Sequence, residues 1–446
     1  MKLQYTDADQ LVKSILKKEP DATKYLNSFM SLVDPSLGII RYFDKEQDYY
    51  GDEPNFTAFR AEIFPTSNYS HGGYKTVKAE GGRSLYPDQA RVGALFESFE
   101  RYCLSIYKIE RLIYSSFNQL TQSGVIVEDP MKFVSSEQSG REELREEKMM
   151  WTSAWSIRYG KEILIPAQCV YLPYQFQQGE PVLRDPLTTG AAAGLTLGKA
   201  ILRGLLEVIE RDSTMIVHYR KIKCQEIDLS QVSGTLKSLI DSLKRYNLEY
   251  KIYDYSLDIP VPVVVCKIID RSGVGPTCTV GAKASFSQES AILGAILEAG
   301  SLRLGIRGVM EEARKESLIA LNDYSKLDTA NRRSFLWSQP EMLHHLDYQD
   351  DSNEKSIKFK EWDEMNEERL KELINVVLEK GGDIIIKDVT TYDIGSYGVK
   401  VVKVIVPGLQ PMHLFEPECS FSNRILEFGG ERMNPDSLNM IPHPFG

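Results

Sequence analysis

The sequence GKAILRGLLEVIERDSTMIVHYR, residues 198–220, predicts a long helix at the centre of the fold. Apolar residues recur in it at helical spacing and leave almost no polar face. Within it LEVIER, residues 206–211, places Glu207 and Glu210 one turn apart, with Arg211 next to them. On a helix that is apolar nearly all round, such carboxylates are expected to point into an interior, where they need cations.

The same Glu-x-x-Glu-Arg arrangement occurs earlier in the chain, in FESFER at residues 96–101. Glu97 and Glu100 are three residues apart, which puts both on one face of a helix, and Arg101 lies beside Glu97 on the i+4 diagonal. Apolar positions around them predict a long helix that begins near Pro87, a residue that helices tolerate in their first turn. Two separate helices therefore carry paired glutamates.

A third predicted helix, SQESAILGAILEAGSLRL at residues 287–304, carries Glu298, with Arg303 and Arg307 downstream. Each helix taken alone fits solvent-facing glutamates that pair with their own arginines. If the three helices converge, however, four or five carboxylates gather in one cleft with arginines between them. Such a cluster suits Mg²⁺ that bridges carboxylates to substrate phosphates, and arginines suit phosphate oxygens. The sequence thus suggests a nucleoside triphosphate site built from helices.

Composition narrows the class of protein. The chain has 446 residues, of which 42% are hydrophobic and 26% charged, and its net charge is −10. It has no Lys/Arg block, which argues against a nucleic acid partner. It also has no apolar run near the length of a membrane span and no signal-peptide pattern, so a cytoplasmic location without membrane contact is expected.

Cysteine and histidine usage argues against a zinc site. The six cysteines are scattered without a C-x-x-C pair, which indicates reduced, buried thiols rather than disulfides. His344 and His345 are adjacent, so on a helix they would point apart, and neither is assigned a metal.

Helices and strands alternate irregularly, which predicts an α+β fold with mixed or antiparallel sheets packed with helices around an internal site. No Gly-x-Gly-x-x-Gly or P-loop is present. We divide the chain into an N-terminal segment leading into the fold, a catalytic core and a proline-rich tail, at residues 1–65, 66–437 and 438–446. TTGAAAGLT, residues 188–196, is interpreted as a turn, and residues 347–368 as a solvated loop.

These motifs resemble the YcaO family, in particular its SagD-like cyclodehydratases (D proteins) of thiazole/oxazole-modified peptide biosynthesis. The resemblance extends from LVDPSLGIIR at residues 32–41, through the three glutamate helices, to VPGLQPM at 406–412 and IPHPFG at 441–446. It implies an internal ATP·Mg²⁺ site. The implied metal ligands are Glu97, Glu100, Glu207, Glu210 and Glu298. The resemblance also places Arg211 near phosphate. Further candidate nucleotide-binding residues are Arg83, Lys199 and Arg303.

The resemblance also implies the reaction and its partners. A Cys, Ser or Thr side chain of a ribosomal precursor peptide adds to the preceding amide carbonyl, ATP phosphorylates the oxyanion, and loss of phosphate leaves a thiazoline or oxazoline. The chemistry suits an enzyme that positions and neutralises charge, since phosphate leaves far more easily than amide oxygen. Implied partners are an E1-like or ThiF-like protein carrying the leader-recognition element and an FMN dehydrogenase, in a homodimer or a larger complex.

The end of the chain departs slightly from its relatives. Related cyclodehydratases end Pro-x-Pro-x-Pro, whereas this sequence has Pro442, Pro444 and then Gly446. Such a tail could be a loose extended segment. In this context the resemblance implies that it inserts toward the active site, which makes these three residues the candidate catalytic ones.

Other departures leave two alternatives open. Gly82, Arg83 and Ser84 stand where the family usually has Gly-Lys-Gly. Further departures at expected phosphate or metal contacts are Ala192, Leu195, Lys199, Gly294 and Ser301. One alternative is a degenerate YcaO scaffold or docking subunit with weak or no ATP turnover. The other is a thioamide- or amidine-forming YcaO enzyme.

Overall fold

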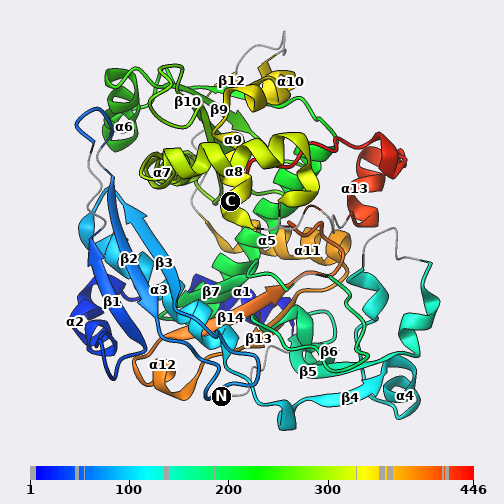
Figure 1. Ribbon diagram of the computed structural model, residues 1–446. Coiled ribbons are helices and arrows are strands. Elements are labelled where there is room, and N and C mark those ends of the chain that lie inside the picture. Colours follow the sequence, from blue (N-terminus) through cyan, green and yellow to red (C-terminus); the bar gives the residue numbers. More distant parts are fainter. Residues whose placement is uncertain are drawn as a thin grey trace.

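The computed structural model describes residues 7–45, 50–54, 56–134, 140–184, 186–327, 329–350, 357–358, 365–413, 416 and 421–445. It has an α+β architecture in which three sheets and their helices surround the long central helix α5 (Leu197–Tyr219), as Figure 1 shows. The α+β expectation is confirmed. Apart from one parallel pair, β8 with β12, the strands pair antiparallel.

The first sheet lies at one side of the molecule, on the left in Figure 1. Its order is β1 (Ile40–Lys45), β2 (Thr57–Ile63) and β3 (Lys78–Ser84). Helix α3 (Pro87–Ser105) packs on β2 and β3, and the short α2 (Leu26–Phe29) packs on α3. Because β2 pairs with β3 along its whole length, the N-terminal segment shares one sheet with the chain that follows residue 65.

The second sheet has the order β4-β5-β13-β14-β7, with β6 added beside β5. Its strands are β4 (Ile113–Ser116), β5 (Lys148–Ser156), β6 (Lys161–Pro166), β7 (Ala191–Gly194), β13 (Ile385–Asp388) and β14 (Lys400–Ile405). Helices α4 (Phe117–Gln122) and α12 (Tyr392–Ser396) lie in its connections. α5 packs across β14 and β7, and α1 (Ala8–Leu16) packs on α5 and on α11 (Glu367–Gly381).

The third sheet has the order β11-β10-β9-β8-β12. Its strands are β8 (Gln225–Asp228), β9 (Glu249–Asp254), β10 (Val263–Ile269), β11 (Cys278–Ala284) and β12 (Ile357–Lys358). Helix α7 (Gln288–Arg307) packs on β10 and β11, and α6 (Gly234–Arg245) contacts β9. The remaining helices are α8 (Met310–Asn322), α9 (Ala330–Trp337), α10 (Asp347–Asp350) and α13 (Asn423–Glu427).

The long helices approach the strands beside them very closely, and glycine makes this approach possible. A Cβ at Gly82 of β3 would lie 2.0 Å from the Ala94 backbone nitrogen of α3. A Cβ at Gly281 of β11 would lie 2.3 Å from the Ala295 carbonyl oxygen of α7. Because no side chain fits in these gaps, α3 and α7 can place side chains directly against the edges of their neighbouring strands.

Three expectations from the sequence are wrong in part. Residues 188–196 are not only a turn, because Ala191–Gly194 form the buried strand β7 through pairing with β14. The expected loop at 347–368 contains α10 and β12, and most of its other residues lie outside the described residues. His344 and His345 do not point apart, because the 3₁₀ helix that carries them brings their ring centroids to 3.9 Å.

Among the described cysteines, Cys103, Cys169, Cys224, Cys266 and Cys278 are buried and free, as expected. Cys419 lies outside the described residues. In the described part of the chain, no helix combines the length and apolar character that crossing a membrane requires.

Candidate functional site

Each of the three sheets presents one edge strand to the same region, and the glutamates of the three helices bind these edges. The edge strands are β3, β7 and β11. An edge strand leaves a row of backbone N–H groups without strand partners. Here glutamate carboxylates accept hydrogen bonds from them.

The hydrogen bonds follow one pattern from helix to strand. Glu97 Oε2 accepts from Gly81 N–H (3.3 Å), Glu100 Oε1 from Ala193 N–H (2.7 Å), Glu207 Oε2 from Gly190 N–H (3.1 Å), Glu210 Oε2 from Ala284 N–H (2.7 Å) and Glu298 Oε2 from Ala282 N–H (2.7 Å). Each pair of glutamates thus joins its helix to two segments, so α3 lies between β3 and β7, and α5 lies between the start of β7 and β11. Through these hydrogen bonds, the paired glutamates of α3 and α5 link the edges of the three sheets to one another.

A cavity of about 1470 Å³ lies where these edges meet. Four of the predicted glutamates line it, namely Glu97, Glu100, Glu207 and Glu298. The fifth, Glu210, is 3% exposed and lies beside the lining residue Arg211, with 3.6 Å between Arg211 Nη1 and Glu210 Oε1. The structure therefore brings all five glutamates into one neighbourhood.

Six basic side chains also line the cavity, and sequence analysis assigned only two of them to the site. Arg83 and Arg211 were predicted. Arg101, Lys78, Arg203 and Lys283 are additional lining residues. The sequence gives a signal for Lys283, which is the one charged residue in an otherwise apolar strand, CTVGAKA. Arg203 was not predictable from its helix alone, because its partner Glu19 comes from a distant segment.

Arg101 neutralises part of the carboxylate cluster. Its Nη2 donates to Glu97 Oε1 at 3.3 Å, and its Nε lies 3.4 Å from Glu80 Oε2 on β3. Burial raises the pKa of Glu100 to about 8 and that of Glu80 to about 7, and the charge of Arg101 opposes both shifts. A cation bound beside these carboxylates would favour their charged form and oppose the effect of burial.

The residues present fit Mg²⁺ and a polyphosphate. Among the described residues, no three His, Cys, Asp or Glu side chains come close enough together to hold a metal ion by themselves, so Mg²⁺ here would need ligands from phosphate and water as well. Each glutamate uses one oxygen to accept from a backbone amide, and within the described part of the chain the second oxygens of Glu100, Glu207 and Glu298 make no hydrogen bond. Arg211 carries two buried nitrogens, Nε and Nη1, without a hydrogen-bond acceptor. Free carboxylate oxygens suit a hard cation and the unsatisfied guanidinium suits phosphate.

Two of the predicted nucleotide-binding residues lie away from the lining of the cavity. Lys199, at the start of α5, is half-buried and lies near the pair formed by Glu19 and Arg203, which does line the cavity. Arg203 Nη1 also donates to the Ala193 carbonyl at 3.1 Å. The arginine that reaches this end of the cavity from α5 is thus Arg203, one turn after Lys199.

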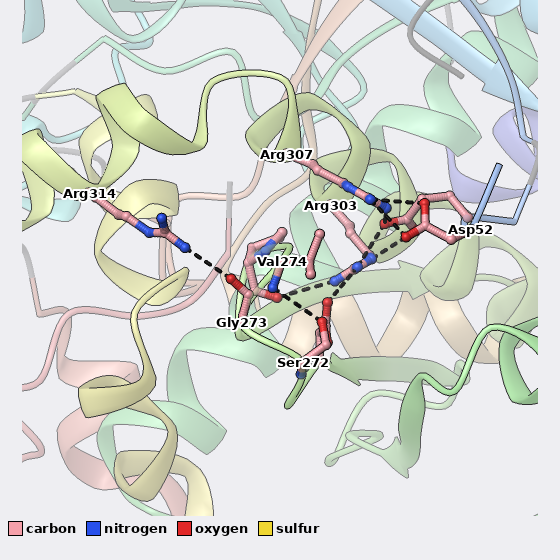
Figure 2. A network of polar contacts seen from close by, with 10 residues as sticks. Asp52, Ser272, Gly273, Val274, Arg303, Arg307 and Arg314 are labelled. Atoms are coloured by element: carbon pink, nitrogen blue, oxygen red, sulfur yellow. Dashed lines mark hydrogen bonds and ion pairs between the residues drawn. The ribbon is translucent and has the colours of Figure 1, made fainter. Parts of the chain in front are cut away.

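Arg303 is held in a separate buried network, which Figure 2 shows. Its Nη2 lies 2.7 Å from both Glu53 Oε1 and Asp270 Oδ2, and its side chain is 4% exposed. Arg307 reaches Glu53 and Asp52 in the same network. Arg303 therefore ties α7 to the segment before β2 and to the turn after β10, and its guanidinium is occupied by carboxylates.

The predicted catalytic tail is docked against the protein. Pro442, His443, Pro444 and Phe445 are buried, with Phe445 in the same apolar core as α5. Trp337 Nε1 donates to the Pro442 carbonyl at 3.1 Å, and His443 Nε2 donates to the His413 carbonyl at 2.7 Å. These tail residues are not among those lining the cavity, whereas Phe335 and Met412 beside their partners are. Gly446 lies outside the described residues.

Of the departures noted in the sequence, Ala192 and Ser301 line the cavity, whereas Leu195 and Gly294 do not. Leu195 donates its N–H to Glu19 Oε1 at 2.7 Å. Gly294 lies against the side chain of Lys283.

A sequence model of the family described as YcaO cyclodehydratase, ATP- and Mg²⁺-binding, matches residues 81–410. A relative, an uncharacterized protein of Methanothermobacter thermautotrophicus, is 28% identical over 338 residues, which are 75% of this chain and 82% of the relative. The cofactors expected from the sequence, ATP and Mg²⁺, are those of the family that matches.

Solved structures share the fold. A heterocyclase in complex with substrate and cofactor aligns with a TM-score of 0.75 at 20% identity, over 96% of this chain and 57% of its own. The present chain therefore spans little more than half of that heterocyclase. YcaO from Methanopyrus kandleri bound with AMPPCP and Mg²⁺ gives 0.60 at 20% identity, over 90% of this chain and 93% of its own. The E. coli microcin synthetase McbBCD complex aligns with a TM-score of 0.62 at 15% identity, over 91% of this chain and 96% of its own.

Proposed function

The chain belongs to the YcaO family, and on that premise we propose that it is an ATP-dependent peptide cyclodehydratase. In the proposed reaction, Cys, Ser or Thr side chains of a ribosomal precursor peptide become thiazolines or oxazolines. The observation that carries the proposal is the ring of glutamates from three helices around one cavity, with free carboxylate oxygens beside unsatisfied arginine nitrogens. This donor set suits Mg²⁺ and polyphosphate together.

The roles of the chain's own residues follow from their positions. When bound, ATP supplies the phosphoryl group that turns the amide oxygen into a leaving group. Glu97, Glu100, Glu207, Glu210 and Glu298 would hold Mg²⁺, directly or by supporting the residues that do. Arg211 and Arg83 would neutralise phosphate oxygens, which stabilises charge that develops during phosphoryl transfer. Because backbone amides already fix one oxygen of each glutamate, the carboxylates need little rearrangement to bind a cation.

A peptide substrate and a partner protein complete the proposal. One fold relative was solved with substrate and cofactor, and another is part of the McbBCD complex. We propose an E1-like or ThiF-like partner that carries the leader-recognition element, and an FMN dehydrogenase that would oxidise the azoline rings, in a natural-product pathway of the bacteriocin kind. We also propose that Pro442, Pro444 and Gly446 take part in catalysis.

A scaffold function with weak ATP turnover is the second candidate. The observation in its favour is the position of Lys199 and Arg303, two expected nucleotide contacts that lie away from the cavity lining. Calorimetric titration of ATP with Mg²⁺ into the purified chain separates the two candidates. Saturable binding followed by phosphate release and loss of water from the peptide supports the cyclodehydratase, whereas absence of binding supports the scaffold.

A further inference from the structure

Lys283 is the one exposed residue of strand β11, whose other residues are buried. Its two neighbours in the strand each hold one glutamate of the site. Ala282 N–H donates to Glu298, and Ala284 N–H donates to Glu210. The Lys283 side chain lines the cavity. A cation is therefore placed between two of the carboxylates, on the wall of the cavity itself.

Gly294 of α7 makes the position of Lys283 possible. A Cβ built on Gly294 would lie 2.6 Å from Cγ and 3.0 Å from Cδ of Lys283. The aliphatic stem of the lysine thus occupies the space that any side chain at residue 294 would fill. Since residue 294 is one helical turn before Glu298, the stem rests on α7 next to that glutamate.

The ammonium group belongs to an exposed residue of the cavity lining. Within the described part of the chain, Lys283 Nζ makes no hydrogen bond or ion pair, although its charge acts on Glu210 by opposing the rise in pKa that burial causes. Arg211, which also lies beside Glu210, carries the unsatisfied Nε and Nη1. Two incompletely satisfied cations beside two carboxylates fit a ligand that is itself a metal-bound polyanion.

We propose that Lys283 binds the phosphate chain of the nucleoside triphosphate, in cooperation with Arg211, and that Gly294 is required to position it. The proposal deepens the proposed function and rests on it. A lysine acts here as a point charge on a flexible stem, which suits one or two phosphate oxygens.

Binding measurements on matched variants test this role. A non-hydrolysable ATP analogue with Mg²⁺, and AMP as the comparison ligand, are titrated calorimetrically into wild type, Lys283→Met, Lys283→Arg and Gly294→Ala. Lys315→Met, at an exposed site paired with Glu311, is the control. Lys283→Met should weaken the triphosphate analogue by about tenfold or more and AMP by less than about twofold, the size expected for one charge-assisted contact. Lys283→Arg should keep most of the affinity.

Gly294→Ala separates position from charge. This change keeps the lysine but displaces its stem, so the analogue should bind more weakly. In a Lys283→Ala background, Gly294→Ala should cause little further loss of affinity, because the clashing Cγ and Cδ are gone. Melting temperatures should stay close to that of wild type. If wild type binds the analogue and Lys283→Met binds it equally well, the role of Lys283 is wrong while the proposed function stands. If wild type binds no nucleotide, both fail.

Discussion

Glu100 of α3 and Ala193 of β7 are joined by a hydrogen bond of 2.7 Å between the carboxylate Oε1 and the backbone N–H. The bond connects residues that are far apart in sequence and closes the exposed edge of a sheet. It also fixes a carboxylate whose second oxygen remains available at the cavity. One side chain thus serves both the fold and the candidate site. Glu207 and Glu298 repeat this arrangement, whereas the second oxygen of Glu97 accepts from Arg101 and Glu210 is buried behind the lining.

Replacing Glu207 by glutamine should abolish phosphate release and leave the fold intact. The amide oxygen of glutamine can still accept from Gly190 N–H, so the link to the start of β7 is kept, whereas the negative charge is lost. Phosphate release and melting temperature are measured on this variant and on Glu311→Gln, an exposed control on α8. ATP consumption at the wild-type rate in Glu207→Gln would count heavily against a metal-binding role.

The contrast between Glu207 and Arg303 shows what the sequence could and could not predict. Helical periodicity placed the paired glutamates on common faces of α3 and α5, because that information is local. The partners of Arg303, Glu53 and Asp270, come from other parts of the chain, and no local pattern reveals them. Proximity to Glu298 in the sequence therefore suggested a nucleotide contact, but the structure holds the guanidinium in an ion-pair network.

Two of the three edge strands, β3 and β7, were missed for a related reason, whereas CTVGAKA, the edge strand β11, was expected as a strand. β7 consists of alanines and glycine, and β3 contains adjacent glycines, so neither has the β-branched residues that favour strands. Their small residues serve the close approach of α3 and α5 instead. The α+β class was predictable from the longer, apolar elements, whereas the strand edges that hold the glutamates follow from tertiary pairing alone.

Arg303→Met should destabilise the protein strongly without removing nucleotide binding. Removing the cation leaves the buried carboxylate of Asp270 without its ion-pair partner and leaves Glu53 with Arg307 alone, which costs about 3–5 kcal/mol. The free energy of unfolding is measured by urea titration, and binding of the ATP analogue is measured at a temperature where the variant is folded. Affinity should stay within about threefold of wild type, a small change in free energy. A folded variant that no longer binds the analogue would restore the original assignment of Arg303 to the nucleotide.

Acid should destabilise the protein through three buried histidines near the tail. Burial lowers the pKa of His218 to about 4 and that of His413 to about 3, and it also lowers the pKa of His443. The unfolded chain, with histidine pKa values near 6.5, then binds more protons than the folded chain below that pH. The stability that these groups contribute is complete above pH 6.5 and falls as the pH drops toward 4.

His218→Gln isolates one of these contributions. The glutamine amide can still donate to the Ile441 carbonyl, which His218 Nε2 contacts at 2.8 Å. Between pH 7 and pH 5, His218 should account for a loss of about 2 kcal/mol in the free energy of unfolding. Over this range the variant should therefore lose about 2 kcal/mol less stability than wild type. The comparison of urea unfolding curves cancels the opposite effect of Glu100, whose raised pKa adds stability as the pH falls. Equal losses in both proteins would show that His218 takes up no proton on unfolding.

Cyclisation should require the partner protein. The chain is incubated with precursor peptide, ATP and Mg²⁺, with and without its E1-like neighbour, and the loss of water from the peptide is followed by mass spectrometry. We expect efficient cyclisation only in the complete mixture, because the proposed partner would carry the element that selects the leader peptide. Equal yields without the neighbour would contradict the division of labour that we propose.

In the tail, residues 442–446, the contribution to packing must be separated from a contribution to catalysis. His443 and Phe445 are fully or almost fully buried, so deleting the segment should lower the melting temperature as well as cyclisation. An extended end without contacts would cost little when removed. Phe445→Ala is the matched control, because it removes from the core the aromatic ring that the deletion also removes, and it keeps both prolines. The loss of this ring costs about 3–5 kcal/mol of stability.

The two tail variants are compared at a temperature at which both are folded. If the tail acts in catalysis, the deletion should lose nearly all cyclisation, whereas Phe445→Ala should keep a substantial part of it. Binding of the ATP analogue should be similar in both, since Pro442 and Pro444 do not line the cavity. Proline restricts the backbone of the segment before it docks, so its ordered position costs little entropy. Equal loss of cyclisation in the two variants would mean that the tail contributes packing alone.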